Sequence, residues 1–266
     1  MTRDATGKGK QDGSQAIARA MALLKAIASG HRDGSAAYVL ADRVGLQRPT
    51  VHRILRRLVL EEMVEQDPGT RHYRLGRLAY ELGLSARRPA HMRQTGSAAL
   101  RRIAHESEDV AFLYSRSGPD CVCIDRAEGA YPVRALVMEV GQRRPLGTGA
   151  ASLSMLSAMP DHDVATILHE NAPRLKVAEE LPIEELLSIV RQAKTDGYVF
   201  KSTVRVPEVL SLAVPILNRH GLPIMALSIS SIASRMVPRM EYLASLLRRE
   251  AGAVRTELEK TNHSNR

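Results

Sequence analysis

Three apolar patterns with helical spacing occupy the first third of the chain. The first runs from residue 17 to residue 27 and is followed by Ser29-Gly30, a helix stop signal. Its apolar positions are Ile17, Ala20, Met21, Leu24 and Ile27. A shorter pattern covers residues 35–44 and ends at Gly45, whose freedom at positive φ suits a tight turn between two helices. We therefore expect one helix capped by Ser14 and a second, short helix before Gly45.

The third pattern combines an apolar stripe with a basic opposite face. Proline is tolerated in the first turn of a helix but not in its interior, so a helix is predicted from about Pro49 onward. Its predicted buried stripe is Val51, Ile54, Leu55 and Leu58. The candidate DNA-binding residues on and around this helix are Gln47, Arg48, Pro49, Thr50, His52, Arg53, Arg56 and Arg57. Such a helix suits the major groove of DNA, where its N-terminal residues meet base edges and its cations meet phosphates.

Two short strand patterns, Met63–Gln66 and Arg71–Leu75, follow this helix and predict a hairpin closed by a Pro-Gly turn. A hairpin directly after a basic helix is typical of a wing. Arg71 and Arg74 are placed to touch the DNA backbone or the minor groove. Basic amphipathic helices also occur on soluble α-helical domains of other kinds. The order of short helix, glycine turn, basic helix and hairpin favours a winged helix-turn-helix.

Beyond the hairpin, helical and strand patterns alternate, which predicts a mixed α/β sheet domain. A helix over residues 76–88, ended by Pro89, is expected to link this domain to the first. The small-residue segment 147–159 predicts a loop that enters a buried helix. Further helices are expected over residues 93–105, 184–196 and 240–258, and strands over residues 109–114, 121–125, 133–140, 210–217 and 223–232.

The predicted architecture is therefore α+β with a modular order. A length of 266 residues suits two domains of ordinary size better than one small core. We expect a disordered tail over residues 1–13, a winged helix-turn-helix over 14–75, a linker helix over 76–90 and a second domain over 91–260.

Composition narrows the protein class. Hydrophobic residues make up 44% and charged residues 25%, as in soluble globular proteins. Apolar runs stay far below the roughly 18 residues of a membrane-spanning helix. The first 13 residues also lack the apolar region of a secretory signal. We expect a cytoplasmic protein with no membrane partner.

The formal net charge of +9 is concentrated in the first third of the chain. Residues 1–90 carry 16 Lys and Arg against 9 Asp and Glu, a net charge of +7. Residues 91–266 carry 22 against 20, a net charge of +2. A basic module joined to a near-neutral one is expected of a DNA-binding domain that carries a separate sensor.

The two cysteines, Cys121 and Cys123, form a C-x-C pair in an apolar segment. This pair is too small for a zinc site, which needs four suitably spaced ligands. Alternation places both thiols on one face of a strand. Packing in the core is the favoured interpretation, and a redox role is the alternative.

Motifs that would indicate catalysis are absent from the sequence. The chain contains no G-x-S-x-G, H-E-x-x-H, G-x-G-x-x-G or P-loop pattern. His162 and His169 are seven residues apart with acidic neighbours, which is typical of the solvated face of a surface helix. We expect no enzymatic activity, no catalytic residue, no cofactor and no metal.

Two segments of the second domain are candidates for ligand binding. Residues 147–152 carry small side chains before an apolar helix, so backbone N–H groups there would favour an anion. The alternative is a tight loop that only allows close backbone approach. Ser228 and Ser230 share one face of an otherwise apolar strand, which suits a polar ligand. Strand serines also often bond only to backbone.

Several of these segments resemble the IclR family of transcriptional regulators. Gln15–Ala20 is similar to the start of the family's DNA-binding domain, Leu40–Leu55 to its helix-turn-helix, and Tyr73–Gly76 to its step from wing to linker. The similarity runs from about residue 14 to about residue 255. The resemblance implies a linker helix that helps to pair subunits and a GAF-like effector-binding domain.

The resemblance also implies an effector site. Residue by residue, the family's effector contacts fall on Ala150, Ala151, Lys201, Ser211, Ser228 and Ser230. Two positions depart from the family pattern. Lys201 stands where Asp or Asn is usual, and Pro207-Glu208 replaces a small residue or glycine. Lys201 would either supply a cation for a carboxylate ligand or point to water.

Together these patterns predict a ligand-responsive transcriptional regulator. It would bind a pseudo-palindromic operator in double-stranded DNA as a homodimer or a dimer of dimers. Its effector would be a small organic acid whose different affinities for two dimer arrangements change DNA affinity. The alternatives are an architectural DNA-binding protein without effector and an enzyme in the second domain. We expect a repressor, although the sign of regulation depends on where the operator lies relative to a promoter.

Overall fold

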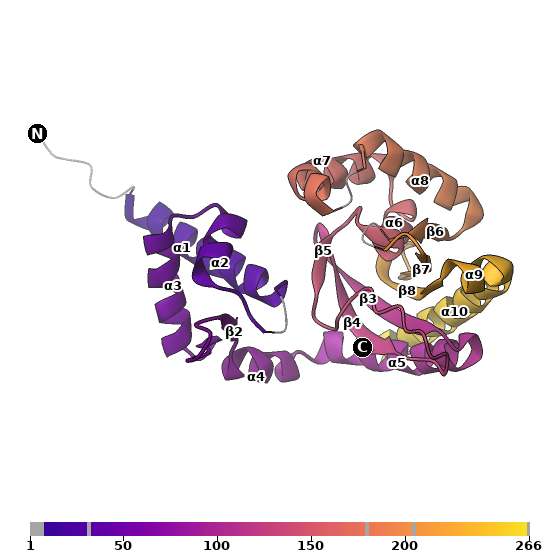
Figure 1. The fold of residues 1–266 in the computed structure, drawn as a ribbon, viewed down its shortest axis with the longest axis horizontal. Helices are drawn as coiled ribbons and strands as arrows, with labels where there is room; N and C mark the ends of the chain where they lie inside the picture. The colour runs from indigo at the N-terminus through magenta and orange to yellow at the C-terminus, as the bar shows by residue number, and fades with distance from the viewer. Residues whose placement is uncertain (1–7, 31–32, 179–180, 204–205, 265–266) are drawn as a thin grey trace, which may run out of the picture. The chain divides into compact units, whose positions relative to one another are not determined.

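The computed structural model describes residues 8–30, 33–178, 181–203 and 206–264 (Figure 1). The chain forms two compact units, Met1–Arg87 and Arg88–Arg266. The expected disordered tail over residues 1–13 is only partly described. Residues 8–13 belong to the first helix, and residues 1–7 lie outside the described residues.

The N-terminal unit is a helix-turn-helix followed by a hairpin and a short helix. Its elements are α1 (Lys8–Ala28), α2 (Ala37–Val44), α3 (Arg48–Leu60), β1 (Val64–Gln66), β2 (Tyr73–Leu75) and α4 (Arg77–Ser85). Gly45 ends α2 with a φ of 64°, as the predicted turn requires. β1 and β2 pair antiparallel and form the predicted wing.

The core of this unit uses only the second half of the apolar stripe predicted for α1. Leu23, Leu24 and Ile27 are buried against α2, α3 and the wing. Ile17 and Met21, both in the predicted stripe, are 67% and 50% exposed. The first half of α1 extends past the small core, so its apolar side chains have no described partner surface within this unit.

The linker is shorter than the sequence predicts. α4 ends at Ser85, and α5 (Arg87–Ser107) begins after the single residue Ala86. Pro89 therefore lies in the first turn of α5 and does not end the preceding helix. A first-turn proline is tolerated because its missing N–H group would have no helical acceptor there.

The C-terminal unit is built on one six-stranded antiparallel sheet. The strand order is β5-β4-β3-β8-β7-β6. The strands are β3 (Val110–Ser117), β4 (Asp120–Ala127), β5 (Arg143–Pro145), β6 (Val199–Ser202), β7 (Val209–Leu217) and β8 (Pro223–Ile232). The helices after α5 are α6 (Gly149–Ser157), α7 (Asp161–Ala178), α8 (Ile183–Asp196), α9 (Ala233–Met236), the 3-10 turn η1 (Val237–Arg239) and α10 (Met240–Ser264). Together the two units confirm the predicted α+β architecture.

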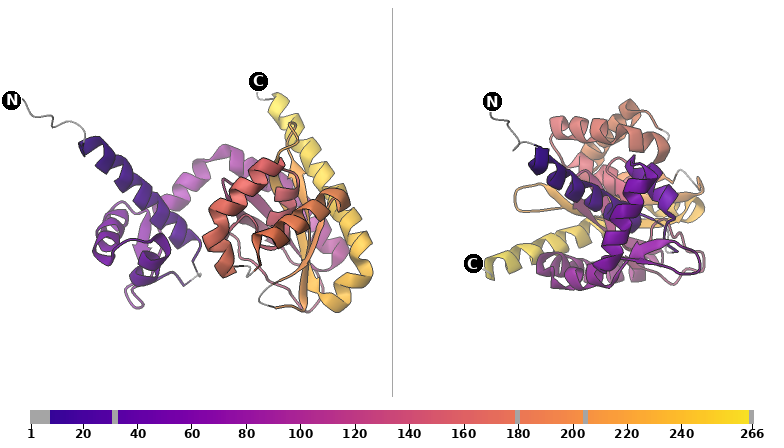
Figure 2. Two further views of the ribbon diagram at one scale, coloured as in Figure 1. Left: turned by 90° about the horizontal axis from the view of Figure 1, so that it is seen from above. Right: turned by 90° about the vertical axis from the view of Figure 1, so that its left-hand side faces the viewer.

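Helices cover both faces of this sheet (Figures 1 and 2). Leu113, Leu212 and Leu227 point into one core, with α5 and α10. Phe112, Ala213 and Ala226 point into the other core, with α6, α7 and α8. Consecutive residues of β3, β7 and β8 thus enter opposite cores, and both cores are apolar. We call the second face, which α6 to α8 cover, the α6 face.

The segment 133–140 is not the strand that its apolar pattern predicts. It has no strand partner, and the N–H groups of Leu136 and Val137 donate to carbonyl oxygens only two residues earlier. Ala135 and Met138 are buried, whereas Leu136 is 51% exposed. The apolar pattern here anchors a loop by two buried residues three positions apart. The short strands β5 and β6 carry too few residues for a periodic signal.

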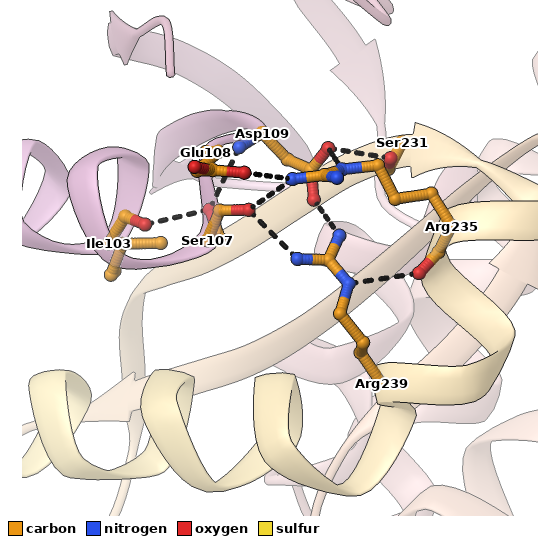
Figure 3. Close-up of polar contacts among 7 residues, drawn as sticks. All are labelled: Ile103, Ser107, Glu108, Asp109, Ser231, Arg235 and Arg239. Carbon is orange, nitrogen blue, oxygen red and sulfur yellow. Dashed lines mark hydrogen bonds and ion pairs between the residues drawn. The ribbon is translucent and has the colours of Figure 1, made fainter. Parts of the chain in front are cut away.

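A buried carboxylate joins three parts of the C-terminal unit (Figure 3). Asp109, whose side chain is 1% exposed, accepts hydrogen bonds from Ser231 at the end of β8 (2.7 Å) and from Arg235 of α9 (3.0 Å). Arg239 of η1 pairs with its other oxygen. Both arginines also donate to the carbonyl oxygen of Ser107 at the end of α5 (3.1 and 2.9 Å). The segment between β8 and α10 is thereby clamped to α5.

The substitution Asp109→Ala is expected to lower the free energy of unfolding by about 3–5 kcal/mol, because it leaves two partly buried guanidinium groups without their shared counter-charge. Urea denaturation of the full chain measures this change. The matched control is Glu108→Ala: Glu108 also pairs with Arg235, but its side chain is 56% exposed, so its loss should cost less than about 1 kcal/mol. Equal losses for both variants would contradict the role given to Asp109.

Both thiols lie buried on the α6 face of β4, as the alternation of the C-x-C pair predicts. Neither cysteine forms a disulfide. Burial in apolar surroundings raises the pKa of Cys121 and of Cys123 from 9.0 to about 12. The thiolate is the reactive form, so these thiols are poor nucleophiles in the folded protein.

We expect the native protein to react slowly with a thiol reagent such as Ellman's reagent at pH 8. A thiol with a pKa of about 12 is roughly a thousandfold less ionised at this pH than one with a pKa of 9.0. Unfolding in guanidinium chloride should release both thiols at the ordinary rate. Rapid reaction of the folded protein would contradict this result and would favour the redox role.

Candidate nucleic-acid interface and ligand site

The exposed face of α3 gathers most of the candidate DNA-binding residues. Val51, Leu55 and Leu58 point into the core and fix the orientation of the helix. The opposite side chains therefore face solvent. Gln47, Arg48, Pro49, His52, Arg53, Arg56 and Arg57 are exposed, and Thr50 is half-buried. Gln47 forms no side-chain cap, so the first N–H groups of α3 remain available at the helix N-terminus.

The arginines of α3 differ in their partners. Arg57 pairs with Glu61 one helical turn later. Among the residues that the structure describes, Arg48, Arg53 and Arg56 have no carboxylate within ion-pair distance. These three guanidinium groups form a positive surface that no described carboxylate of the unit neutralises.

The two candidate arginines of the wing differ in exposure and in partners. Arg71 is exposed at the tip, in the left-handed region with a φ of 60°. Arg74 is half-buried and pairs with Asp67 across the turn at 2.7 Å. Hydrogen bonds from the backbone and side chain of Thr70 hold the pKa of Asp67 below its ordinary value. Arg74 therefore stabilises the turn, whereas Arg71 is presented to solvent.

Chain direction changes sharply where the wing ends, at Gly76. A Cβ atom at this position would lie 2.3 Å from the carbonyl oxygen of Glu62. The N–H of Gly76 also donates to the Met63 carbonyl oxygen at 2.9 Å. This close approach explains the glycine in the Tyr73–Gly76 motif and fixes the wing against the end of α3.

The sheet brings the candidate ligand-binding serines together on the α6 face. Ser211 of β7 lies directly opposite Ser230 of β8, and their hydroxyl oxygens are 2.7 Å apart. Ser228 lies two residues along β8, opposite Phe112. All three serines are buried. Their hydroxyl groups thus interrupt an otherwise apolar face.

The other candidate ligand residues border the same face. Lys201 of β6 is half-buried and lies directly opposite Ser211. Ala150 and Ala151 are buried in the first turn of α6, which packs against β6, β7 and β8. Pro207 and Glu208, the second departure from the family pattern, are exposed.

Sequence reasoning missed a polar group at the start of α6. Thr148 is the N-cap residue, yet its side chain makes no capping bond. Its hydroxyl oxygen is buried and has no hydrogen-bond partner among the described residues. A buried hydroxyl without a hydrogen bond lowers the stability of the fold by about 1–3 kcal/mol. The Thr148 hydroxyl is therefore available for a further hydrogen bond. Threonine just before a small-residue helix was the available signal.

A second polar cluster on the α6 face was also missed. Tyr114 of β3 is buried beside both thiols, and burial raises its pKa well above the ordinary value. The two thiols raise this pKa further, whereas the positive charge of Arg144 and a hydrogen bond with Ser228 lower it. The hydroxyl of Tyr114 therefore links the serines of β8 to the β4–β5 side of the sheet. Only the thiols of this cluster carried a sequence signal.

Two further properties concern the described residues as a whole. No group of three or more His, Cys, Asp or Glu side chains in the described part of the chain is arranged to hold a metal ion. None of the described helices combines the length and apolar character needed to cross a membrane.

Comparison with protein families identifies both units. Residues 16–68 match the model of the IclR helix-turn-helix domain. Residues 86–256 match the model described as bacterial transcriptional regulator IclR C-terminal. The HTH-type transcriptional regulator XynR of Escherichia coli (strain K12) is 26% identical over 194 residues, which cover 73% of this chain and 77% of the relative.

Solved structures show the same fold. An IclR transcriptional regulator from Alicyclobacillus acidocaldarius has a TM-score of 0.73 and 24% identity, over 91% of this chain and 98% of that chain. An IclR homologue from Microbacterium hydrocarbonoxydans, solved in complex with 4-hydroxybenzoate, has a TM-score of 0.68 and 22% identity, over 92% of this chain and 99% of that one. With both units matched, the chain belongs to the IclR family of transcriptional regulators, with a DNA-binding helix-turn-helix domain and a C-terminal effector-binding domain.

Proposed function

We propose that this protein regulates transcription by inserting α3 into the major groove of an operator. The observation that carries this proposal is the exposed cationic face of α3, with three arginines that have no carboxylate partner among the described residues. Arginines that neutralise DNA phosphates release the counterions condensed on them, and this release favours the binding of DNA to such a surface. A helix N-terminus without a side-chain cap adds a site for one phosphate group.

In this proposal, different residues read the bases and bind the phosphates. The N-cap residue Gln47 and, in the first half of α3, Arg48, Thr50 and Arg53 would read base edges or nearby phosphates, with Pro49 and His52 beside them. Arg56, Arg57 and Arg71 would hold phosphates. Arg57 would exchange its intrahelical partner Glu61 for a phosphate on binding. We assign Arg74 to support of the wing, because its charge is paired with Asp67.

A homodimer, or a dimer of dimers, would present two such helices to a pseudo-palindromic site. A single short recognition helix contacts only a few base pairs, so two copies separated by one helical turn of DNA are the usual solution. The exposed Ile17 and Met21 of α1 are apolar surface that pairing of subunits would bury.

The substitution Arg56→Ala should weaken binding to operator and to unrelated DNA alike, and should reduce the slope of log affinity against log salt by about one unit. Arg53→Ala should in addition lower the preference for the operator by about 1–3 kcal/mol if Arg53 reads a base. Fluorescence anisotropy with both DNA types at several salt concentrations measures these effects.

The control for this pair is Arg101→Ala, which removes an exposed arginine from the C-terminal unit. It should leave affinity and salt slope unchanged. The assignment of α3 fails if neither Arg53→Ala nor Arg56→Ala alters affinity for any DNA.

We further propose that the effector is a small organic acid bound on the α6 face. The paired Ser211 and Ser230, together with Ser228, supply hydroxyl groups in an apolar setting, as expected of a ligand site. The near-neutral charge of residues 91–266 and the 4-hydroxybenzoate in the structural neighbour support a small-molecule sensor. Lys201 and the first turn of α6, with Ala150 and Ala151, would border the ligand.

A thermal-shift screen of the full chain against organic acids, including benzoate, 4-hydroxybenzoate and pyruvate, tests this site. A ligand at a concentration 100 times its Kd stabilises the folded state by about 2.7 kcal/mol, which raises the melting temperature measurably. Ser230→Ala and Ser228→Ala should each reduce the shift. The exposed Ser188→Ala on α8 should not. Shifts that survive both buried substitutions would place the ligand elsewhere.

A further inference from the structure

Arg144 occupies an unusual position on the C-terminal sheet. It lies on β5 directly opposite Cys121, which points into the core of the α6 face. Residues directly opposite one another on neighbouring strands share a face, so the Arg144 side chain also leaves the sheet on this side. The side chain is half-buried, between the sheet and the loop over residues 131–142.

The partners of Arg144 contrast with those of its neighbour. Arg143 pairs with the buried Asp120 at 2.9 Å and bonds the hydroxyl of Ser117. Arg144 donates to the carbonyl oxygen of Val137 at 2.9 Å. Among the described residues it has no carboxylate within ion-pair distance. A half-buried guanidinium with five donors is thus served by one neutral acceptor.

The ionisable groups around Arg144 do not supply the missing negative charge. Its charge acts on Tyr114, Cys121 and Cys123, lowering the pKa of each. Burial outweighs this effect and keeps the phenol and both thiols neutral at physiological pH. A partly desolvated cation whose ionisable neighbours on β3 and β4, Tyr114, Cys121 and Cys123, are neutral favours an incoming anion.

The surroundings of Arg144 are continuous with the proposed effector site. Tyr114 lies opposite Ala226 of β8 and diagonal to Ser228 on the same face, and Ser228 lowers its pKa. On the other side, the N–H of Thr148 donates to the Pro145 carbonyl oxygen at 3.2 Å and closes the turn that leads from β5 into α6. Thr148, with its unpartnered buried hydroxyl, therefore lies at one end of a tight turn and Arg144 at the other.

We infer that Arg144 is the specificity-determining residue of the proposed effector site, and that its guanidinium binds the carboxylate of an acidic ligand whose body lies beside Tyr114 on the α6 face. This inference rests on the proposed effector function. It assigns the charge selection to a residue that the family pattern did not indicate.

Two cations, Arg144 and Lys201, could bind the carboxylate of the ligand. They lie on β5 and β6, which are the opposite edges of the sheet. Five strand spacings separate them, roughly 24 Å along the sheet. One carboxylate group cannot pair with two cations on opposite edges of the sheet. Its carboxylate is therefore bound at one edge only, and the two cations can be tested independently.

The test compares each carboxylate with its uncharged amide: benzoate with benzamide, and 4-hydroxybenzoate with 4-hydroxybenzamide. Isothermal titration calorimetry of the full chain should show the wild type preferring the carboxylate by about tenfold to a hundredfold, as for a hydrogen-bonded ion pair. Arg144→Gln removes the charge but keeps a donor for the Val137 carbonyl oxygen. It should abolish the preference while the amide binds within about twofold of wild type. Arg144→Lys should restore part of the preference.

The matched control is Lys201→Met, which should keep the full preference. Thermal melts establish that each variant is folded. If Arg144→Gln does not fold, the comparison of Arg144→Lys with Lys201→Met shows which of the two cations sets the preference for the carboxylate. The inference is overturned if Arg144→Gln retains the preference, or if only Lys201→Met loses it. The proposed effector site still stands in that case if Ser228→Ala weakens binding. Absence of binding by both carboxylates to the wild type overturns the inference and the organic-acid proposal together.

Discussion

Burial of the central sheet on both faces is the constraint on which the C-terminal unit depends. In the buried parts of β3, β7 and β8, consecutive residues enter opposite apolar cores, so a slip of one residue would exchange the contents of both. Polar groups on these strands must then find partners inside the protein, because water does not reach them. Ser211 and Ser230 satisfy one another, and Tyr114 uses Ser228.

Two exceptions to this rule lie beside the proposed ligand site. The buried hydroxyl of Thr148 has no described partner, and Arg144 has no described counter-charge. Both residues flank the turn between β5 and α6. The chain that precedes β5, over residues 131–142, forms a loop and not a further strand. Unsatisfied polar groups cost stability in the ligand-free protein, and they gather where a ligand with the complementary groups would compensate for that cost. The DNA-binding unit follows the opposite logic: α3 buries one stripe only, and its unpaired arginines stay in water.

Local signals in the sequence were sufficient for the first unit. Pro49, Gly45 and the Pro-Gly turn each act within a few residues, so α2, α3 and the wing could be predicted with nearly correct limits. The second unit depends on contacts that spacing does not encode. Asp109 meets Arg235 across 126 residues, and Arg144 faces Cys121 only through the pairing of β4 with β5. Pro89 and the segment 133–140 misled for a related reason. A first-turn proline resembles the proline that ends a helix, and an apolar loop anchored by Ala135 and Met138 resembles an apolar strand.

The clamp on Asp109 gives the proposed ligand site its rigidity. Ser230 and Ser231 are consecutive on β8 and therefore point to opposite faces. Ser230 faces the candidate site, whereas Ser231 donates to Asp109, which the two arginines hold against the end of α5. The strand that carries the ligand-facing hydroxyl groups is thus fixed from behind, one residue away, by a network of charged hydrogen bonds. Rigid placement of this kind lowers the ordering cost of binding, because the serines need not be immobilised when the ligand arrives. The structural carboxylate on one face of β8 consequently supports the serines that are proposed to contact a ligand on the other face.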